Sequence, residues 1–163
     1  MISFDVGTHR FQVRAAAVIT WNGSVLLHRF EQDEFWALPG GRVEPGEDAA
    51  STVVREMQEE LHQAVACGPL LFVVENFFAY REKPNHEIGF YFRVVLPGDS
   101  PLLDASRSHL GREGDRALEF RWFPLAGLGD VNLHPSFLRS ALARPMPGVA
   151  HIVQRDLRSD MPT

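Results

Sequence analysis

The chain has 163 residues and a mass of 18.3 kDa, which accommodates one domain of ordinary size. Hydrophobic residues make up 45% and charged residues 23%, a balance that excludes wholesale disorder. A net charge of −5 disfavours a broad basic surface for nucleic acid or anionic lipid. The single cysteine, Cys67, excludes an internal disulfide and a cysteine-rich zinc site.

The chain lacks the sequence signals of membrane insertion and export. Its apolar runs, such as 15–20 and 69–74, are far too short to span a bilayer. The first residues do not show a charged start followed by an apolar stretch. We therefore expect a cytoplasmic protein with no membrane partner, folded as a single domain over residues 1–163.

The first half of the chain predicts two strands and a helix. Residues 11–21 read as a strand, and Asn22 and Gly23 form a strong hairpin signal before a return strand at 24–30. Residues 48–61 have helical periodicity, with an expected apolar stripe made of Ala50, Val54, Met57 and Leu61.

The second half predicts more strands, a long loop and a second helix. Residues 70–79, 86–96 and 118–123 read as strands, and 97–115 as a long polar surface loop. We expect a C-terminal helix at 135–143 and a loosely held tail at 145–163, which leaves a core of about 10–143. The order of elements predicts an α/β fold in which helices pack on a mixed β-sheet.

Three glutamates gather on one side of the first predicted helix. Glu56, Glu59 and Glu60 are spaced i, i+3 and i+4, so their charges repel one another by about 0.2–0.5 kcal/mol per pair. A divalent cation such as Mg²⁺ or Mn²⁺, which prefers carboxylate oxygens, would offset that repulsion. The alternative is a solvated acidic helix face.

The residues around these glutamates favour the metal site over the solvated face. Glu47 adds a fourth acid near the start of the helix, and Arg55 lies where it can clamp a carboxylate. Gly40 and Gly41 precede the helix and permit close approach of a ligand to the backbone.

This segment resembles the signature of the Nudix hydrolases, G-x5-E-x7-R-E-U-x-E-E-x-G-U, where U is a bulky aliphatic residue. Seven of its nine fixed positions match in register within 41–63. The two departures are His62, where the family has Gly, and Gln63, where it has an aliphatic residue. Without that Gly, the helix is free to run on or to end differently. The seven matching residues are Gly41, Glu47, Arg55, Glu56, Met57, Glu59 and Glu60.

The resemblance implies an α/β/α sandwich around a mixed sheet and a metal-dependent hydrolase. Members of the family cleave a pyrophosphate bond in a nucleoside diphosphate derivative, with Mg²⁺ or Mn²⁺ and water as the nucleophile. By position, Glu56, Glu60 and Glu59 resemble metal ligands, together with the Gly40 carbonyl. Catalytic roles fall to Glu59, Glu56 and Arg55, and supporting roles to Gly41 and Glu47.

The general base and the substrate contacts are less specified. Some family members use a helix glutamate and others a carboxylate from a later loop, for which Glu113 is the first candidate and Glu119 and Glu87 are alternatives. Candidate substrate contacts are Arg29, Tyr80, Arg81 and Glu87, of which the arginines could bind phosphate in bidentate fashion.

Several substrates and one rival function stay open at this point. Tyr80, 17 positions after Gln63, weakly favours dinucleoside polyphosphates as substrates. Nucleoside triphosphates, including oxidised ones, are the most inclusive expectation. The rival is a Nudix-fold module that binds a nucleotide without cleaving it. A small-molecule nucleotide partner is expected under either function, and a homodimer is left open.

Overall fold

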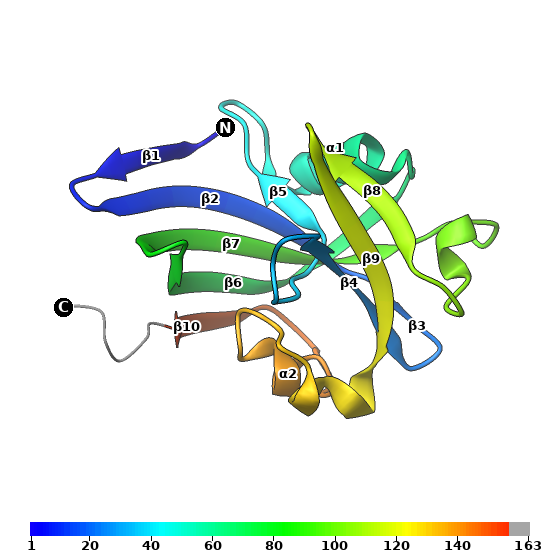
Figure 1. Cartoon of the computed structure of the whole chain (residues 1–163). Helices are drawn as coiled ribbons and strands as arrows, with labels where there is room; N and C mark the ends of the chain where they lie inside the picture. Colours follow the sequence, from blue (N-terminus) through cyan, green and yellow to red (C-terminus); the bar gives the residue numbers. More distant parts are fainter. Residues whose placement is uncertain (157–163) are drawn as a thin grey trace.

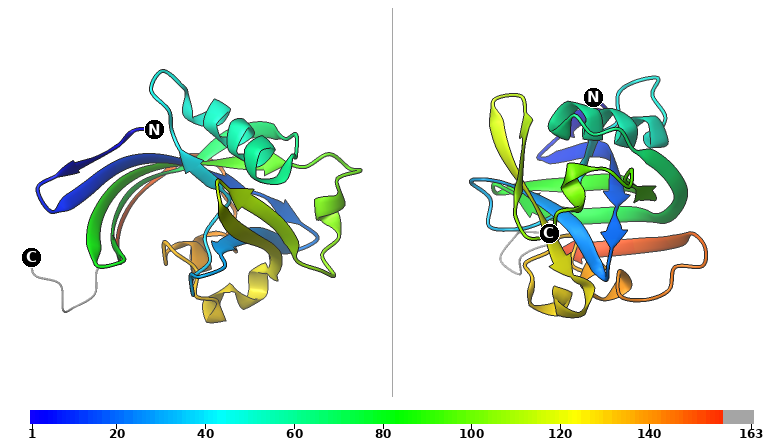
Figure 2. Two further views of the ribbon diagram at one scale, coloured as in Figure 1. Left: turned by 45° about the horizontal axis from the view of Figure 1, so that its top comes forward. Right: turned by 90° about the vertical axis from the view of Figure 1, so that its right-hand side faces the viewer.

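The chain folds into two β-sheets with helical segments on both sides (Figure 1). The computed structural model describes residues 1–156. Figure 2 shows α1 on one side of the sheets and α2 on the opposite side. The elements in chain order are β1 (Ser3–Val6), β2 (His9–Val18), β3 (Thr20–Trp21), β4 (Ser24–Phe30), β5 (Gly40–Arg42), α1 (Ala49–Leu61), β6 (Ala66–Tyr80), β7 (Lys83–Val95), the 3₁₀ helix η1 (Pro101–Leu103), β8 (His109–Glu113), β9 (Arg116–Pro124), the 3₁₀ helix η2 (Leu125–Asp130), α2 (Leu138–Ala141) and β10 (Ala150–Asp156).

The larger sheet has the strand order β1-β2-β7-β6-β10, and β5 pairs with β2 off this path. The β2–β7 and β6–β10 pairs are parallel, whereas the remaining pairs are antiparallel. The smaller sheet, β3-β4-β9-β8, is antiparallel throughout. This combination confirms the predicted α/β fold with a mixed sheet.

Two apolar clusters fill the space between these layers. One lies toward η2 and α2 and includes Val18, Trp36 and Leu138. The other lies toward α1 and includes Met57 and Phe120. Strands β2 and β4 contribute residues to both clusters, so they separate the cluster near α1 from the cluster near η2 and α2. Within residues 1–156, no helix is both long enough and apolar enough to cross a bilayer.

Several predicted elements are confirmed. Asn22 and Gly23 both have positive φ, 48° and 74°, and join β3 to β4 as the hairpin signal indicated. Helix α1 begins one residue after Asp48, whose side chain accepts a hydrogen bond of 2.8 Å from the Ser51 backbone N–H.

The buried face of α1 differs from the predicted stripe. Val54 is 39% exposed, while Val53, Glu56, Met57 and Glu60 are buried. These four residues follow the helical spacing i, i+3, i+4 and i+7, so the inward face is rotated by about one residue. The spacing of apolar residues predicted the wrong stripe because two of the inward residues, Glu56 and Glu60, are charged.

The prediction of a continuous loop at 97–115 is wrong, since η1 and β8 lie within it. Strand β8 alternates between buried His109 and Gly111 and exposed Leu110 and Arg112. Its inward positions are therefore a polar residue and a glycine, which hides the usual alternation of hydrophobic residues. A Cβ on Gly111 would lie 2.6 Å from the Glu60 carbonyl oxygen, so glycine allows β8 to approach α1.

The C-terminal expectations need two corrections. The predicted helix at 135–143 is reduced to α2, a single turn. The tail expected to be loosely held contains β10, which pairs in parallel with Phe72–Phe78 of β6. Alternate residues of β10, including Ile152, pack inward, and this binds the segment to the core. Residues 157–163 of that tail lie outside the described residues.

Candidate active site

The site begins with the glycines of β5, which lie between β2 and α1. A Cβ on Gly40, at a φ of 150°, would fall 2.1 Å from the Ala15 carbonyl oxygen. A Cβ on Gly41 would fall 2.2 Å from the Glu56 carboxyl group. The two glycines are therefore required so that β5 can lie against β2 on one side and against a buried carboxylate on the other.

Arg55 connects the glutamates of the site. Its guanidinium donates to both carboxylate oxygens of Glu47, at 2.8 and 3.0 Å. Nη1 donates to Glu56 at 2.8 Å and to Glu59 at 3.2 Å, and Nη2 donates to the Arg42 carbonyl oxygen at 3.1 Å. The hydrogen bonds from Arg55 lower the pKa of Glu47 to about 2, so this carboxylate is a permanent anchor for Arg55.

Glu56 and Glu60 are carboxylates buried beside each other. Burial raises the pKa of both, and the charge of Glu56 adds to the rise at Glu60, whose pKa reaches about 9. Within residues 1–156, Glu60 Oε2 is buried and has no hydrogen-bond partner. An unpaired carboxylate oxygen in such a place is costly to the folded protein, and a bound cation would offset that cost.

His28 on β4 lies behind Glu60, and sequence reasoning missed it. Its Nδ1 is 3.8 Å from Glu60 Oε2, and burial lowers the pKa of His28 to about 3. The ring is therefore neutral near pH 7 and does not neutralise Glu60 as an ion pair. The signal in the sequence was a histidine within the otherwise apolar run of β4, at an inward position.

Two of the candidates for the general base, Glu59 and Glu113, lie on different elements. Glu59 is 59% exposed at its side chain and accepts a hydrogen bond of 3.2 Å from Arg55. Glu113 ends β8, and its charge contributes to the raised pKa of Glu56 and Glu60. The charges of both Glu59 and Glu113 therefore add to the raised pKa of Glu60.

The other predicted site residues are engaged elsewhere. Arg29 forms an ion pair of 3.1 Å with Glu119, whose pKa burial would raise but hydrogen bonds from Ser108 and Arg29 lower overall. The Tyr80 hydroxyl donates to Asp33 at 3.2 Å, and Arg81 lies over the Tyr80 ring at 5.2 Å.

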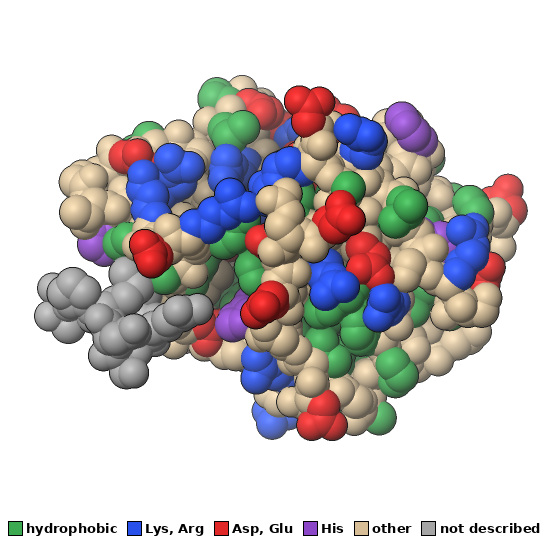
Figure 3. Space-filling view, in the orientation of Figure 1, with side chains coloured by type: hydrophobic (Ala, Val, Ile, Leu, Met, Phe, Trp, Pro, Cys, Tyr) green, Lys and Arg blue, Asp and Glu red, His purple; other side chains and the backbone are tan. Residues whose placement is uncertain are grey.

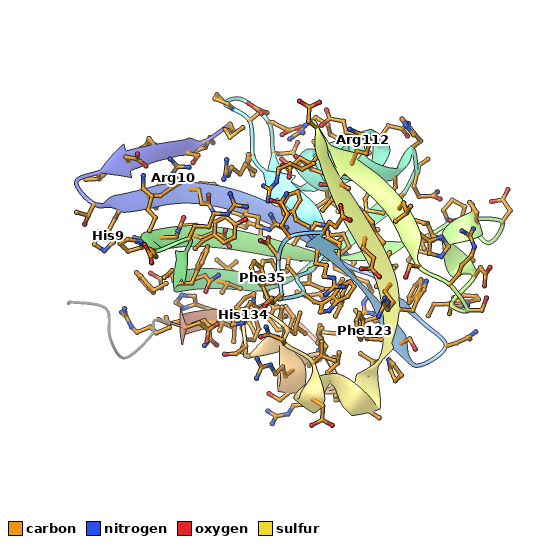
Figure 4. The ribbon with its side chains drawn as sticks, viewed as in Figure 1. His9, Arg10, Phe35, Arg112, Phe123 and His134 are labelled. Atoms are coloured by element: carbon orange, nitrogen blue, oxygen red, sulfur yellow. The ribbon has the colours of Figure 1, made fainter. Side chains whose placement is uncertain are left out.

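Glu87 lies on the inner face of the larger sheet. It is buried on β7, where its carboxylate accepts hydrogen bonds from Gln12 at 2.6 Å and from Asn76 at 3.5 Å. In the space-filling view, Lys and Arg side chains gather above a hollow in the surface (Figure 3). Figure 4 shows that Arg10 on β2 and Arg112 on β8 lie on either side of β5.

The residue types of the site suit a cation, although the side chains are not clustered. Within residues 1–156, no group of three or more His, Cys, Asp and Glu side chains is already close enough to hold a metal ion. Arg55 instead holds Glu56 and Glu59. The buried, unpaired oxygen of Glu60 next to Glu56 nevertheless provides hard anionic ligands of the kind that Mg²⁺ and Mn²⁺ prefer.

Comparison with known proteins shows what this chain is similar to. A Bacillus subtilis protein named "Putative 8-oxo-dGTP diphosphatase" is 47% identical over 89 residues, which span 53% of this chain and 56% of that protein. The match therefore covers little more than half the length of that relative.

Solved structures share the fold. A NUDIX hydrolase from Nitrosomonas europaea superposes with a TM-score of 0.62 at 20% identity, covering 88% of this chain and 78% of that one. A MutT NUDIX hydrolase from Burkholderia pseudomallei gives a TM-score of 0.54 at 27% identity, covering 71% and 84%. The family model of the NUDIX domain matches residues 10–144, and this chain therefore belongs to the Nudix hydrolase family.

Proposed function

We propose that this chain is a divalent-metal-dependent pyrophosphohydrolase of nucleoside triphosphates, with oxidised triphosphates such as 8-oxo-dGTP as the preferred class. The observation that carries the proposal is the buried pair Glu56 and Glu60, with an unpaired oxygen on Glu60. The name of the Bacillus subtilis relative supports the substrate class. Tyr80, whose hydroxyl binds Asp33, gives no added support to dinucleoside polyphosphates.

Glu56, Glu60, Glu59 and the Gly40 carbonyl would hold Mg²⁺ or Mn²⁺. When bound, such a cation neutralises phosphate charge and lowers the pKa of a water molecule. Arg55 orients Glu56 and Glu59, and Glu47 fixes Arg55 from the other side. Glu59 or Glu113 would accept the proton of the attacking water, since both are exposed carboxylates beside the buried pair.

The proposal is tested by product analysis on a nucleotide panel. The panel holds normal and oxidised dNTPs, ADP-ribose, nucleotide sugars and dinucleoside polyphosphates, each with Mg²⁺, with Mn²⁺ and with EDTA. We expect metal-dependent conversion of an oxidised dNTP into a nucleoside monophosphate and pyrophosphate, with a higher kcat/KM than for the normal dNTP. Preference for another class would overturn the substrate assignment.

Variants assign the roles within the site. Glu60→Gln should lower kcat about 100-fold or more, whereas Glu82→Gln, in the exposed β6–β7 turn, should leave kcat unchanged. Comparing Glu59→Gln with Glu113→Gln identifies the base, because its loss lowers kcat about 10²–10⁴-fold. If no nucleotide is cleaved by the wild type but one raises its Tm, the chain is instead a nucleotide-binding module.

A further inference from the structure

Three arginines crowd together on the face of the larger sheet that adjoins the site. Arg10 and Arg14 lie on the same face of β2, and Arg42 of β5 is paired in register with Arg14. All three are half-buried. Burial lowers the pKa of Arg42, and the charges of Arg10 and Arg14 lower it further, which shows that the three guanidinium groups lie close together.

These guanidinium groups keep donors that no protein group uses. Among residues 1–156, neither Nη atom of Arg10 has a hydrogen-bond partner, and the same holds for Nη2 of Arg42 and for Nε and Nη1 of Arg14. Asp5 binds Arg10 at 3.0 Å but also binds Lys83 at 2.7 Å. The negative charges of Glu87 and Glu113 also act on Arg42, so the feature that suits the cluster to an anion is its set of unused, directed donors.

A chain of buried hydrogen bonds fixes the orientation of Arg42. The Gln12 amide donates from Nε2 to Glu87 at 2.6 Å and accepts at Oε1 from Arg42 Nε at 3.0 Å. Gln12 and Glu87 are both buried, and the pairing determines which way the Gln12 amide points. This leaves Arg42 Nη2 available to a ligand, so Gln12 and Glu87 are positioning residues.

The cluster adjoins the proposed metal site. The positive charge of Arg14 opposes the rise in pKa at Glu56 and Glu60, which places Arg14 near both carboxylates. The backbone carbonyl of Arg42 accepts the 3.1 Å hydrogen bond from Arg55. A polyphosphate chain with one phosphate at the buried glutamates could therefore place its next phosphates at the three arginines.

We propose that Arg10, Arg14 and Arg42 form the binding site for the polyphosphate chain of the substrate, with Arg42 held in place by Gln12 and Glu87. The inference rests on the proposed function, because it assumes a nucleotide whose phosphates reach the buried glutamates. It replaces Arg29 and Arg81 as phosphate contacts, since Arg29 is paired with Glu119 and Arg81 lies over Tyr80.

The test measures binding of inorganic tripolyphosphate by calorimetry in EDTA, where only the protein can hold the anion. We expect Arg42→Gln and Arg10→Gln to weaken Kd about 10-fold each, because each removes charge-assisted hydrogen bonds. Arg144→Gln, on an exposed arginine after α2, is the matched control and should bind as the wild type does. Equal Kd values for all three variants would overturn the proposal.

Gln12→Leu tests the positioning role, because it removes both hydrogen bonds of the Gln12 side chain without changing the net charge. We expect tripolyphosphate to bind several-fold more weakly and, with substrate, KM to rise by a similar factor while kcat stays within about 2-fold. Arg42→Lys keeps the positive charge but loses the paired donors of the guanidinium. Its Kd for tripolyphosphate should lie between those of the wild type and Arg42→Gln. Unchanged Kd and KM in Gln12→Leu would remove Gln12 and Glu87 from the proposal.

The two proposals fail in different ways. If the arginine variants lose tripolyphosphate binding but the wild type cleaves no nucleotide, the anion site stands and the proposed hydrolysis is wrong. If the wild type cleaves nucleotides but Arg10→Gln and Arg42→Gln bind and turn over as Arg144→Gln does, hydrolysis stands and the anion site is wrong.

Discussion

At the scale of single residues, the site is a set of charges that restrain one another. Arg55 is anchored by the low-pKa carboxylate of Glu47 and thereby holds Glu56 and Glu59. Glu60 has no such partner among the described residues, and burial raises its pKa. The Glu47 carboxylate is thus fully charged at neutral pH, while burial favours the protonated form of Glu60.

This difference predicts how the metal-free protein responds to pH. The pKa of Glu60 is 4.5 in the unfolded chain and about 9 in the folded one. Its stabilising contribution is therefore complete below the lower value and is lost as the pH rises through the upper one. We expect Tm in EDTA to fall as the pH approaches 9, and the Tm of Glu60→Gln to fall less. An equal fall of Tm with pH in the wild type and Glu60→Gln would contradict this prediction. Glu82→Gln is the control and should follow the wild type.

The sequence was sufficient to name the glutamates but not their different environments. Glu56, Glu59 and Glu60 occupy matching positions of the Nudix signature, and yet two are buried and one is exposed. Burial depends on the approach of β5 and β8 to the helix, which involves contacts distant in the chain. The arginine cluster was missed for the same reason, since Arg10, Arg14 and Arg42 meet only through the pairing of β2 with β5.

At the scale of elements, the end of α1 shows how one departure from the family signature is accommodated. His62 stands where the family has glycine, and it still adopts the left-handed conformation, with φ 53° and ψ 32°. Its backbone N–H donates to Gln58 O at 3.0 Å, and the helix ends there. The expectation that the helix would run on or end differently is therefore corrected. Gln63 accepts a 2.5 Å hydrogen bond from Ser100, which ties the next segment to η1.

The left-handed conformation of His62 predicts a stabilising substitution. A non-glycine residue in the left-handed region destabilises the folded protein by about 1–2 kcal/mol. Glycine removes this strain, but it also makes the unfolded chain more flexible, which offsets part of the gain. We expect His62→Gly to raise the free energy of unfolding by about 0.5–1 kcal/mol in urea titrations. His62→Val, which suits this conformation poorly, should lower it. A Gly variant that is less stable than wild type would show that the imidazole has an unseen stabilising role.

At the scale of the whole molecule, the last strand completes the sheet that bears the anion site. Strand β10 lies on the outer edge of β6, and Ala150 and Ile152 pack against the core cluster beside α2. Sequence patterns predicted the central strands well because their apolar runs are long. They missed β10 because its inward positions are a mixture of Ala, Ile, Gln and Asp, which gives little hydrophobic alternation.

Two neighbouring residues of β10 test its contribution. Ile152 is half-buried against the core, whereas Val153 is 53% exposed on the opposite face. We expect Ile152→Ala to cost about 2 kcal/mol of unfolding free energy, and Val153→Ala less than about 0.5 kcal/mol. The free energies come from chemical denaturation of both variants. Equal losses would indicate that β10 does not pack as described.

The parallel pairing of β10 with β6 also bears on the order in which the chain folds. The β6–β7 hairpin closes over a short turn, whereas β10 must return from far along the chain to reach the same strand. Closing so long a loop is slow, and β10 is expected to dock last. Until then, the edge of β6 is open to strands of other molecules. Refolding at high protein concentration should therefore lose more material to aggregation than refolding of the same protein at high dilution.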